Sequence, residues 1–391
     1  MRILHIVING IYSPGLAYQD NLLPKYHVRM GNEVFIMASC QVYDKEKKKL
    51  TELPAGETVT SNGETLIRVP FRRIINSGIA ARLRLVPEME QKLERITPDF
   101  IMLHGVSTLS IPSLARYMKK HKEVRLIIDN HADFSNSAMN PISHYLLHRG
   151  LWRCMTHIIA PYTETFYGVI PARVDFLRNE YRAPKEKCAL LLMGADDDLA
   201  HKAADPAVIR AVREKYQVDQ SDFLIVTGGA INASKKQTLL LMQAVRQMTN
   251  KRLKLLIFGS VSGELRQSFD AFVDGVKIQN IGWLHADDTY PLIAAADLAV
   301  YPGRHSTLWE QTVGQGIPMI CKYWDGTTHV DIGGNVRFLY QDSAAEIREQ
   351  LEQLLTDPSS YKEMKKAAGG HGREQFLYGR IAEQCLARRG A

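Results

Sequence analysis

The sequence predicts an α/β protein with two doubly wound, Rossmann-like domains, and three observations lead to this fold class. Short apolar runs of strand length alternate with helical patterns along the chain. The runs are apolar on both faces, as parallel strands are when helices cover both sides of their sheet. The chain also has 391 residues, more than one hydrophobic core usually serves. We therefore expect two parallel sheets, each covered by its own helices.

The predicted strands form two series. The first series comprises RILHIVI (2–8), EVFIMAS (33–39), DFIMLH (99–104), VRLIID (124–129) and THIIA (156–160). The second series comprises FLIVTG (223–228), LKLLIFG (253–259), ADLAVYP (296–302) and IPMICK (317–322). Between them, GADDDLAHKAADP (194–206) interrupts the apolar rhythm and leads into a helix. We expect an N-terminal domain at 1–200, a C-terminal domain at 201–370, and a closing helix, 371–391, that packs back on the N-terminal domain.

Charge and cysteine content narrow the class of protein. The net charge of +7 and the pI near 9.0 suit an anionic ligand. No basic run is interleaved with aromatic residues, and KEKKK (45–49) fits a solvated loop, so we expect no nucleic-acid partner. The five cysteines lack metal-ligand spacing, which favours a reducing cytoplasm and no metal. The N-terminal apolar run is too short for a secretion signal.

Polar and glycine residues follow the strands of the first series, at the sheet edge where ligands bind open α/β sheets. Gly15 lies in the loop after the first strand, where backbone amides before a helix could face a phosphate; a plain strand-to-helix turn is the alternative. His131 and Asp133 follow the strand VRLIID, a polar constellation that a core would not need, so we favour a functional role. His104 ends another strand and fits a structural role equally well.

The second series carries two further candidate segments. TGGAINASKKQT (227–238) places glycines after a strand and two lysines at the next helix, an arrangement that suits a pyrophosphate; a surface lysine pair is the alternative. HSTLWEQTVGQGIP (305–318) offers Ser306 and Thr307 as helix caps and Glu310 as a carboxylate that could accept hydrogen bonds from a ribose diol. Its alternative is a capped helix with a solvent-facing Glu.

These segments stand in a distinctive order. The order runs through YQDNLLPKYHVRMGNEV, MGADDDL, GGAINASKK, LLIFGS, IQNIGWLHADDTYPLIAAADLAVYPG and WEQTVGQGIPMI. In this order the chain resembles family 4 glycosyltransferases of bacterial glycan type, which are retaining enzymes that use nucleotide sugars. Their fold is GT-B, in which two Rossmann-like domains face a central cleft. The likeness covers nearly the whole chain.

The resemblance implies roles for individual residues. Lys235 would bind the donor diphosphate, Gly15 would face it, and His131 would contact the donor sugar. Glu310 or Gln311 would be the ribose ligand, the second Glu of the family's E-x7-E motif. It implies catalytic residues His131, Asp133, Lys235 and Glu310, and donor-binding residues Gly15, Gly229, Lys236, Gly259, Trp283, Arg304, His305, Ser306, Thr307 and Gln311. Two departures stand out: Ala230 replaces the family's diphosphate Arg, and Gly303 or Arg304 replaces the first motif Glu.

The expected function is transfer of a hexose, with retention, from a nucleoside diphosphate sugar to a glycan or lipid-linked glycan hydroxyl. UDP sugars are the expected donors, and we expect the donor as a co-substrate with no tightly bound cofactor or metal. A cytoplasmic location is expected, with peripheral membrane contact through the basic and apolar segment FRRIINSGIAARLRL as one reading and an ordinary amphipathic helix as the other. The alternatives are a non-catalytic GT-B subunit, a sugar-nucleotide epimerase and a phosphorylase.

Overall fold

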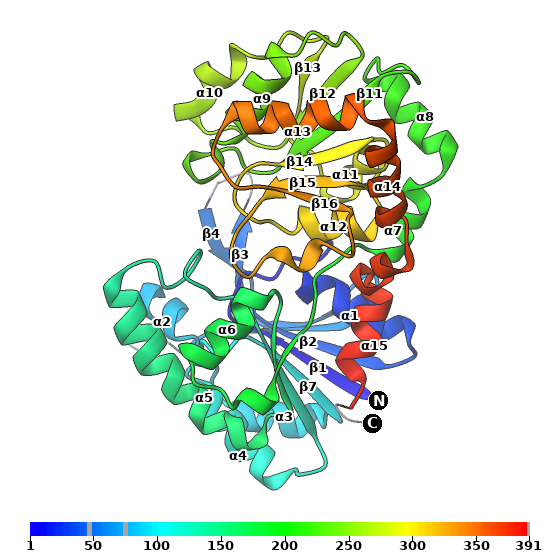
Figure 1. Cartoon of the computed structure of the whole chain (residues 1–391). Coiled ribbons are helices and arrows are strands. Elements are labelled where there is room, and N and C mark those ends of the chain that lie inside the picture. The colour runs from blue at the N-terminus through cyan, green and yellow to red at the C-terminus, as the bar shows by residue number, and fades with distance from the viewer. Residues whose placement is uncertain (45–48, 73–76, 389–391) are drawn as a thin grey trace. The chain divides into compact units, whose positions relative to one another are not determined.

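The computed structural model describes residues 1–44, 49–72 and 77–388, and it divides the chain into two compact units. Unit 1 comprises Met1–Leu192 together with Ala382–Ala391, and unit 2 comprises Met193–Ile381. Each unit is built around its own largely parallel sheet (Figure 1). The predicted fold class, two Rossmann-like α/β domains, is therefore confirmed.

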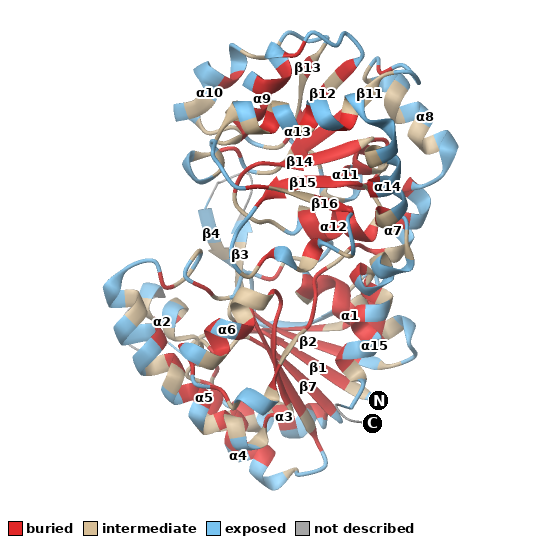
Figure 2. Ribbon diagram, in the orientation of Figure 1, coloured by how far each residue is buried: buried red, intermediate tan, exposed pale blue. Residues whose placement is uncertain are grey.

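Unit 1 contains an eight-stranded sheet of order β10-β9-β8-β7-β1-β2-β6-β5. Its strands are β1 (Arg2–Val7), β2 (Glu33–Ser39), β5 (Gly56–Val59), β6 (Thr65–Val69), β7 (Phe100–His104), β8 (Arg125–Asn130), β9 (Thr165–Gly168) and β10 (Cys188–Leu190). All neighbours pair in parallel except β5 and β6. A separate antiparallel pair joins β3 (Gln41–Asp44) to β4 (Lys49–Glu52). The parallel strands are almost wholly buried (Figure 2).

Helices cover the sheet of unit 1. They are α1 (Gln19–Arg29), α2 (Ser77–Leu83), α3 (Met89–Ile96), α4 (Ile111–Lys120), the π-helix η1 (Ser143–Trp152), α5 (Arg153–Ile159), α6 (Pro171–Asn179) and the last part of α15 (Tyr378–Leu386), with short 3-10 turns η2 (Ala160–Tyr162) and η3 (Lys185–Lys187). Alternate residues of β1 point to opposite faces of the sheet. Leu4 and Ile6 pack into the core cluster that also holds Leu93 and Leu114, whereas Val7 packs into a second cluster with Ile36.

One predicted strand is wrong. THIIA (156–160) lies at the end of helix α5, where the Thr156 hydroxyl donates to the carbonyl of Trp152, one helical turn earlier. The strand of this region is β9, which begins at Thr165. An apolar run this short fits a buried helix turn as well as a strand, and α5 continues directly from η1.

Unit 2 contains a six-stranded parallel sheet of order β13-β12-β11-β14-β15-β16. Its strands are β11 (Phe223–Gly228), β12 (Leu253–Phe258), β13 (Ile278–Gly282), β14 (Leu298–Tyr301), β15 (Met319–Lys322) and β16 (Val336–Leu339). Its helices are α7 (Asp197–Ala203), α8 (Pro206–Lys215), α9 (Thr238–Gln247), α10 (Gly263–Asp270), α11 (Ala286–Ala294), α12 (Leu308–Gly314), α13 (Ala344–Thr356), α14 (Pro358–Ala368) and the first part of α15, with 3-10 turns η4 (Ala233–Lys235), η5 (Thr328–Val330) and η6 (His371–Phe376).

The division between the units differs from the boundaries at 200 and 370 that the sequence suggested. The segment around Ala195 belongs to unit 2 because it pairs with the chain next to η6: Ala195 N donates to Phe376 O, and Tyr378 N donates to Ala195 O. Asp196 caps α7 through the backbone amides of Asp198 and Leu199. Helix α15 crosses the division, so only its last residues are held in unit 1, where Arg125 donates to the carbonyl of Leu386.

Candidate functional site

The strand order of unit 2 places its candidate site. The chain passes from β11 outward to β13, then returns to β14 beside β11 and continues outward to β16. Ligands of open α/β sheets bind at such a switch point, outside the carboxyl ends of the two central strands. Two loops leave the sheet there: Gly229–Asn232 after β11, and Pro302–Thr307 after β14. Both coincide with segments that the sequence singled out.

Glycines let these loops approach one another closely. Gly229 and Gly259 have φ of +112° and +117°, a backbone region that favours glycine. A Cβ at Gly259 would lie 2.0 Å from the carbonyl oxygen of Gly229, and one at Gly303 would lie 3.3 Å from Cα of Lys235. The predicted donor-binding residue Gly259 therefore has a structural reason to be glycine, because a side chain there would push the Gly229 loop away.

Two cations face this switch point without an anion. Lys235 is half-buried, and its Nζ lies 3.4 Å from where a Cβ of Gly229 would be. Burial, reinforced by the nearby Arg304 cation, lowers the pKa of Lys235 from its ordinary value. In the described parts of the chain, neither the Lys235 ammonium nor the Arg304 guanidinium has a hydrogen-bond or ion-pair partner. Two neighbouring like charges that lack a counter-charge suit an anionic ligand.

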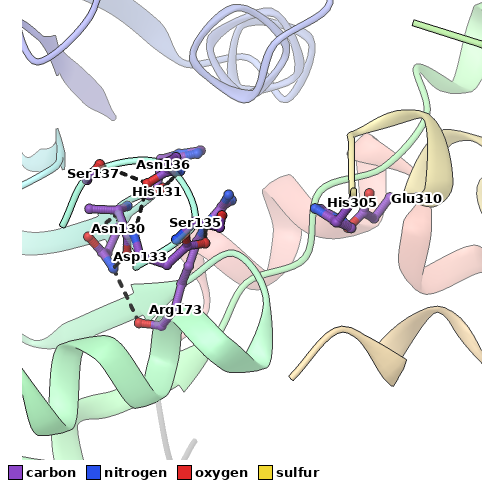
Figure 3. Close-up of polar contacts among 10 residues, drawn as sticks. Asn130, His131, Asp133, Ser135, Asn136, Ser137, Arg173, His305 and Glu310 are labelled. Carbon is purple, nitrogen blue, oxygen red and sulfur yellow. Dashed lines mark hydrogen bonds and ion pairs between the residues drawn. The ribbon is translucent and has the colours of Figure 1, made fainter. Parts of the chain in front are cut away.

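Helix α12 carries a buried carboxylate, Glu310, shortly after Arg304 in the sequence. Glu310 Oε1 accepts hydrogen bonds from His305 Nε2 at 2.7 Å and from His329 Nε2 at 2.9 Å (Figure 3 shows the His305 pair). The carboxylate is fully buried, and Oε2 has no partner among the described residues. Burial alone would raise the pKa of Glu310, but the two histidines outweigh it and hold that pKa well below its ordinary value. Glu310 is therefore ionised and orients both imidazole rings.

This geometry changes the predicted roles of the residues at the start of α12. Glu310 was expected to accept hydrogen bonds from a ligand, but its carboxylate is fully buried and Oε1 already accepts from His305 and His329. Gln311, the other candidate, donates to Thr289 Oγ1 on α11 and is mostly buried. Thr307 is the cap residue of α12, yet its side chain makes no capping hydrogen bond, and Ser306 contributes only its carbonyl, which accepts from Trp309 N.

The remaining predicted donor-binding residues of unit 2 lie at the surface. Trp283 follows β13, has 57% of its surface exposed and packs edge-on against His285. An exposed aromatic ring at the carboxyl edge of the sheet suits a flat ligand group. Lys236 is exposed and lies near the Asp342 carboxylate, so its charge has an acidic neighbour that Lys235 lacks.

The loop after β8 forms the candidate site of unit 1 (Figure 3). Asn130 Nδ2 donates to the carbonyls of Ala132 and Arg173, and Asn136 Nδ2 donates to the carbonyl of His131. Asp133 Oδ1 accepts from the amide of Ser135, and Oδ2 accepts from Arg173 Nε of α6 at 2.9 Å. Asp133 was expected to be catalytic, but it is buried and both oxygens are bonded, so its role here is to fix the loop.

His131 is an accessible member of this loop, with 43% of its side chain exposed. Its Nε2 lies 3.2 Å from Asp129 Oδ2, and His104 Nδ1 lies 2.8 Å from the same oxygen. Burial would raise the pKa of Asp129, but His104 and His131 together hold it well below its ordinary value. The loop after β1 contributes Gly15, whose φ of +77° favours glycine and whose Cβ position has no neighbour within 4 Å.

Among the described residues, two groups of side chains could hold a metal ion. His104, Asp129 and His131 form one, and His305, Glu310 and His329 form the other; within each group the ligand atoms lie within 4.8 Å of one another. In each group the carboxylate oxygen is also within hydrogen-bond distance of both ring nitrogens. Hydrogen bonds alone therefore account for both arrangements.

Sequence reasoning missed the partners of these groups. His329 follows β15 in a segment with no recognised motif, and its link to Glu310 arises only through the fold. His5 and His27 were also missed, although each interrupts an otherwise apolar or helical run, in RILHIVI and in YHVRM. A polar ring inside a buried strand needs a hydrogen-bond partner, and that requirement was the available signal.

Comparison with known proteins agrees with the geometry of unit 2. Residues 222–357 match the family of glycosyl transferases, group 1. This part of the chain is thus similar to group 1 glycosyltransferases. The match covers β11 to α13 and thus includes both loops of the switch point, Lys235, Arg304 and Glu310. The expectation of a glycosyltransferase enzyme is confirmed at this level. No curated protein sequence matches the chain.

Solved structures with the same fold span nearly the whole chain. HepE from Anabaena in complex with UDP has 15% identity and a TM-score of 0.69, and the alignment covers 98% of both chains. WaaG, a glycosyltransferase involved in lipopolysaccharide biosynthesis, has 15% identity, a TM-score of 0.65 and full coverage of both chains. UDP-GlcNAc 2-epimerase from Neisseria meningitidis has 12% identity, a TM-score of 0.64, and coverage of 99% and 98%. These likenesses establish the GT-B fold. Among the described residues, no helix is long and apolar enough to cross a bilayer.

Proposed function

We propose that the chain transfers a hexose from a UDP sugar to a hydroxyl group of a glycan or lipid-linked glycan, with retention at the anomeric carbon. The observation that carries this proposal is the pair of uncompensated cations, Lys235 and Arg304, at the switch point of the glycosyltransferase domain. UDP is proposed as the nucleotide because HepE, which shares the fold, was solved with UDP and with UDP-glucose. A screen of different sugar nucleotides tests both the base and the sugar.

The chemistry follows from stabilising the leaving group. The bond between the anomeric carbon and the β-phosphate oxygen breaks, and a bond from that carbon to the acceptor oxygen forms on the same face. The acceptor proton passes to the departing diphosphate, so the products are a glycoside and UDP. Lys235 and Arg304 would offset the charge that develops on the diphosphate, and a partly buried site strengthens that interaction. This account needs no second carboxylate as nucleophile.

Arg304 compensates for the residue that the chain lacks. Group members are expected to hold the diphosphate with a Lys and an Arg, and Ala230 stands where the Arg would be. Arg304, on the loop after β14, lies close enough to Lys235 to depress the Lys235 pKa. A guanidinium there can bind phosphate oxygens through two N–H groups. In this proposal Arg304 would take the place of the missing Arg from the other loop of the switch point.

Two further side chains of unit 2 would bind the donor. The Glu310 carboxylate holds His305 through Nε2, which leaves His305 Nδ1 as the nitrogen that can face a ligand. Trp283 would stack on the base, since its ring is exposed beyond β13. In unit 1, His131 would contact a sugar hydroxyl, because it is an exposed polar side chain at the carboxyl edge of that unit's sheet.

The experiment is a donor and acceptor screen. The protein is incubated with UDP-, GDP- and ADP-sugars and a panel of glycan acceptors, and release of nucleoside diphosphate is measured together with the product. Lys235→Ala is compared with Lys251→Ala, an exposed lysine before β12 at the opposite end of the strands. Acceptor-dependent UDP release that falls at least about 100-fold in Lys235→Ala only would support the proposal. NMR of the product then reads the anomeric configuration directly.

Each alternative predicts a different result. An epimerase would change the configuration of the sugar nucleotide without any acceptor, and the structural likeness to UDP-GlcNAc 2-epimerases makes this the control to run first. A non-catalytic subunit would give neither product with any donor. A product with an inverted anomeric centre would contradict the proposed retention of configuration but not the proposed glycosyl transfer.

We propose the cytoplasm as the site of the reaction, because all five cysteines are free. Peripheral membrane contact through FRRIINSGIAARLRL also stays a proposal, and residues 73–76 of that segment lie outside the described residues, as does most of KEKKK. Flotation with anionic liposomes at low salt tests it: a protein that stays at the bottom of the gradient does not bind this surface.

A further inference from the structure

A line of five side chains crosses unit 1, and we call it the histidine line: His27, His5, His104, Asp129 and His131. His27 Nδ1 lies 2.9 Å from His5 Nε2, and His5 Nδ1 lies 3.0 Å from His104 Nε2. Asp129 Oδ2 then lies 2.8 Å from His104 Nδ1 and 3.2 Å from His131 Nε2. The first four are buried, and only His131 reaches the surface.

The sheet register assembles this line. His104 and Asp129 are direct neighbours across β7 and β8. His5 pairs with Met102, two residues before His104, so the His5 and His104 side chains lie on the same face of the sheet. Helix α1 packs against β1 and β2 and supplies His27. The line therefore runs from α1 across the three strands β1, β7 and β8 to the carboxyl edge, where His131 lies in the loop after β8.

Hydrogen-bonding rules fix two protons in the line. An ionised carboxylate can only accept, so both ring nitrogens that face Asp129 Oδ2 must carry hydrogen. These are Nδ1 of His104 and Nε2 of His131. A neutral imidazole has one N–H, so a neutral His131 keeps Nδ1 as an unprotonated acceptor. Nδ1 of His131 has no hydrogen-bond partner in the described parts of the chain.

Charge balance assigns the positive member of the line. A buried carboxylate needs a compensating charge, and His104 is the buried ring against it. Burial would lower the pKa of His104, but Asp129 outweighs burial and holds that pKa above its ordinary value. Burial and the neighbouring rings lower the pKa of His5, and burial lowers that of His27. His104 is thus the imidazolium that balances the Asp129 carboxylate.

Other titratable groups surround the line. Asp20 at the start of α1 interacts electrostatically with His104, His131 and Asp129, and burial raises its pKa. Cys385 of α15 faces Asp129, and burial strongly disfavours its thiolate. Asp133, the nearest other acid of the loop, is committed to Arg173. Asp129 is consequently the carboxylate that bonds to His131.

We propose that Asp129 and His104 are positioning residues that hold His131 with hydrogen on Nε2 and thereby present Nδ1 to accept a hydrogen bond or proton from a sugar hydroxyl. The identity of that hydroxyl rests on the proposed function. The protonation pattern itself rests only on the contacts within unit 1. A neutral acceptor at this loop would take the hydroxyl hydrogen of a bound sugar, whereas an imidazolium there would only donate.

The test reads the protonation pattern directly. Long-range ¹H–¹⁵N spectra of the uniformly labelled full chain at pH 7.5 distinguish the two neutral tautomers and the imidazolium, and His131→Asn and His104→Asn assign the two signals. We expect His131 neutral with hydrogen on Nε2 and His104 doubly protonated. In Asp129→Asn, whose amide can also donate, His131 should become a mixture of tautomers. Asp20→Asn is the matched control: it removes a nearby charge without removing a hydrogen bond to His131, and it should leave the His131 tautomer unchanged.

His104→Asn serves where Asp129→Asn fails to fold, since an Asn amide nitrogen can replace Nδ1 as donor to Asp129. In that variant His131 should take over the imidazolium form, because it becomes the remaining ring that can balance Asp129. Hydrogen on Nδ1 of wild-type His131, or a His131 signal unchanged in Asp129→Asn, would overturn the proposal. So would one equivalent of zinc bound by the wild type and lost in Asp129→Asn, because the line would then be a ligand set.

The spectra need no substrate, so they separate this proposal from the proposed function. If the screen finds a transferase activity, Asp129→Asn should lower kcat by at least about tenfold with little change in the KM for the donor, and should shift the acidic limb of the pH profile. If the spectra show the expected protonation pattern but no transferase activity is found, the protonation pattern of the histidine line is supported. Only the assignment of a sugar hydroxyl as the partner of His131 is then contradicted. An unchanged pH profile in an active Asp129→Asn enzyme would contradict the positioning role.

Discussion

The buried ring of His27 predicts that unit 1 loses stability below pH 6.5. Burial, with a smaller contribution from His104, lowers the pKa of His27 to about 4. In the unfolded chain a histidine has a pKa of about 6.5. As the pH falls below that value, the unfolded state takes up a proton that folded His27 refuses, so the free energy of unfolding decreases. The decrease continues until the pH reaches the folded pKa near 4 and then levels off.

The size of this effect follows from the two pKa values. Between pH 7.5 and pH 5, a shift from about 6.5 to about 4 lowers the free energy of unfolding by about 2 kcal/mol. His27→Asn removes the titrating ring and should remove about 2 kcal/mol of the pH dependence, whatever the variant costs at pH 7.5. His5 titrates in the same direction, so some dependence will remain in the variant.

Hydrogen exchange supplies the assay because it reads unit 1 alone. The free energy of opening is measured for peptides covering β1 and β7, in wild type and His27→Asn, at pH 5 and pH 7.5 after correction for intrinsic exchange rates. For each protein, the free energy of opening at pH 5 is subtracted from that at pH 7.5. The two resulting losses of stability are then compared. If both proteins lose the same free energy of unfolding within about 0.5 kcal/mol, His27 is not a buried neutral ring in the folded state. The assignment of the positive charge to His104 rather than to His27 would then be wrong.

Three further predictions concern unit 2. Glu310→Gln keeps one acceptor for His305 but loses the charge, and should lower the stability of unit 2 by about 1–3 kcal/mol in urea unfolding; an unchanged midpoint would mean that the buried carboxylate is not ionised. Gly259→Ala should cost about 1–3 kcal/mol because of its positive φ, while Gly263→Ala, where a Cβ meets nothing within 4 Å, should fold normally; equal melting temperatures would refute the close approach. Trp283→Ala should weaken calorimetric UDP binding by about 1–3 kcal/mol, and equal affinity would exclude stacking.

The strands show which part of the fold the sequence could predict. EVFIMAS and FLIVTG coincide with β2 and β11 because apolar runs of strand length bounded by polar turns favour buried parallel strands. THIIA was assigned to a strand and is helical, since five residues carry no periodicity that separates the two states. The polar edge strand β5 was not predicted at all, because every residue in it is exposed and no apolar pattern marks it.

For the candidate sites, the sequence predicted the positions of residues along the chain but not their contacts. Position along the chain was enough to place Lys235 and His131 at strand exits, because the carboxyl edge follows from strand order. The contacts of these residues could not be predicted. Asp133 and Gln311 were expected to contact the ligand, but in the structure Asp133 pairs with Arg173 and Gln311 donates a hydrogen bond to Thr289. A short motif specifies where a side chain leaves the backbone, but only the packed neighbours decide whether its polar atoms are still available.

The measurement that tests the central claim most directly is a calorimetric titration of UDP, GDP and ADP into the wild type and Lys235→Ala. The central claim is that the switch point of unit 2 binds the diphosphate of a UDP sugar through uncompensated cations. Selective binding of UDP, weakened by about 10- to 100-fold when Lys235 is replaced, is the predicted result, since a hydrogen bond to a charged group contributes about 1.5–3 kcal/mol. No binding of any nucleotide, or UDP binding of equal strength in both proteins, would contradict it.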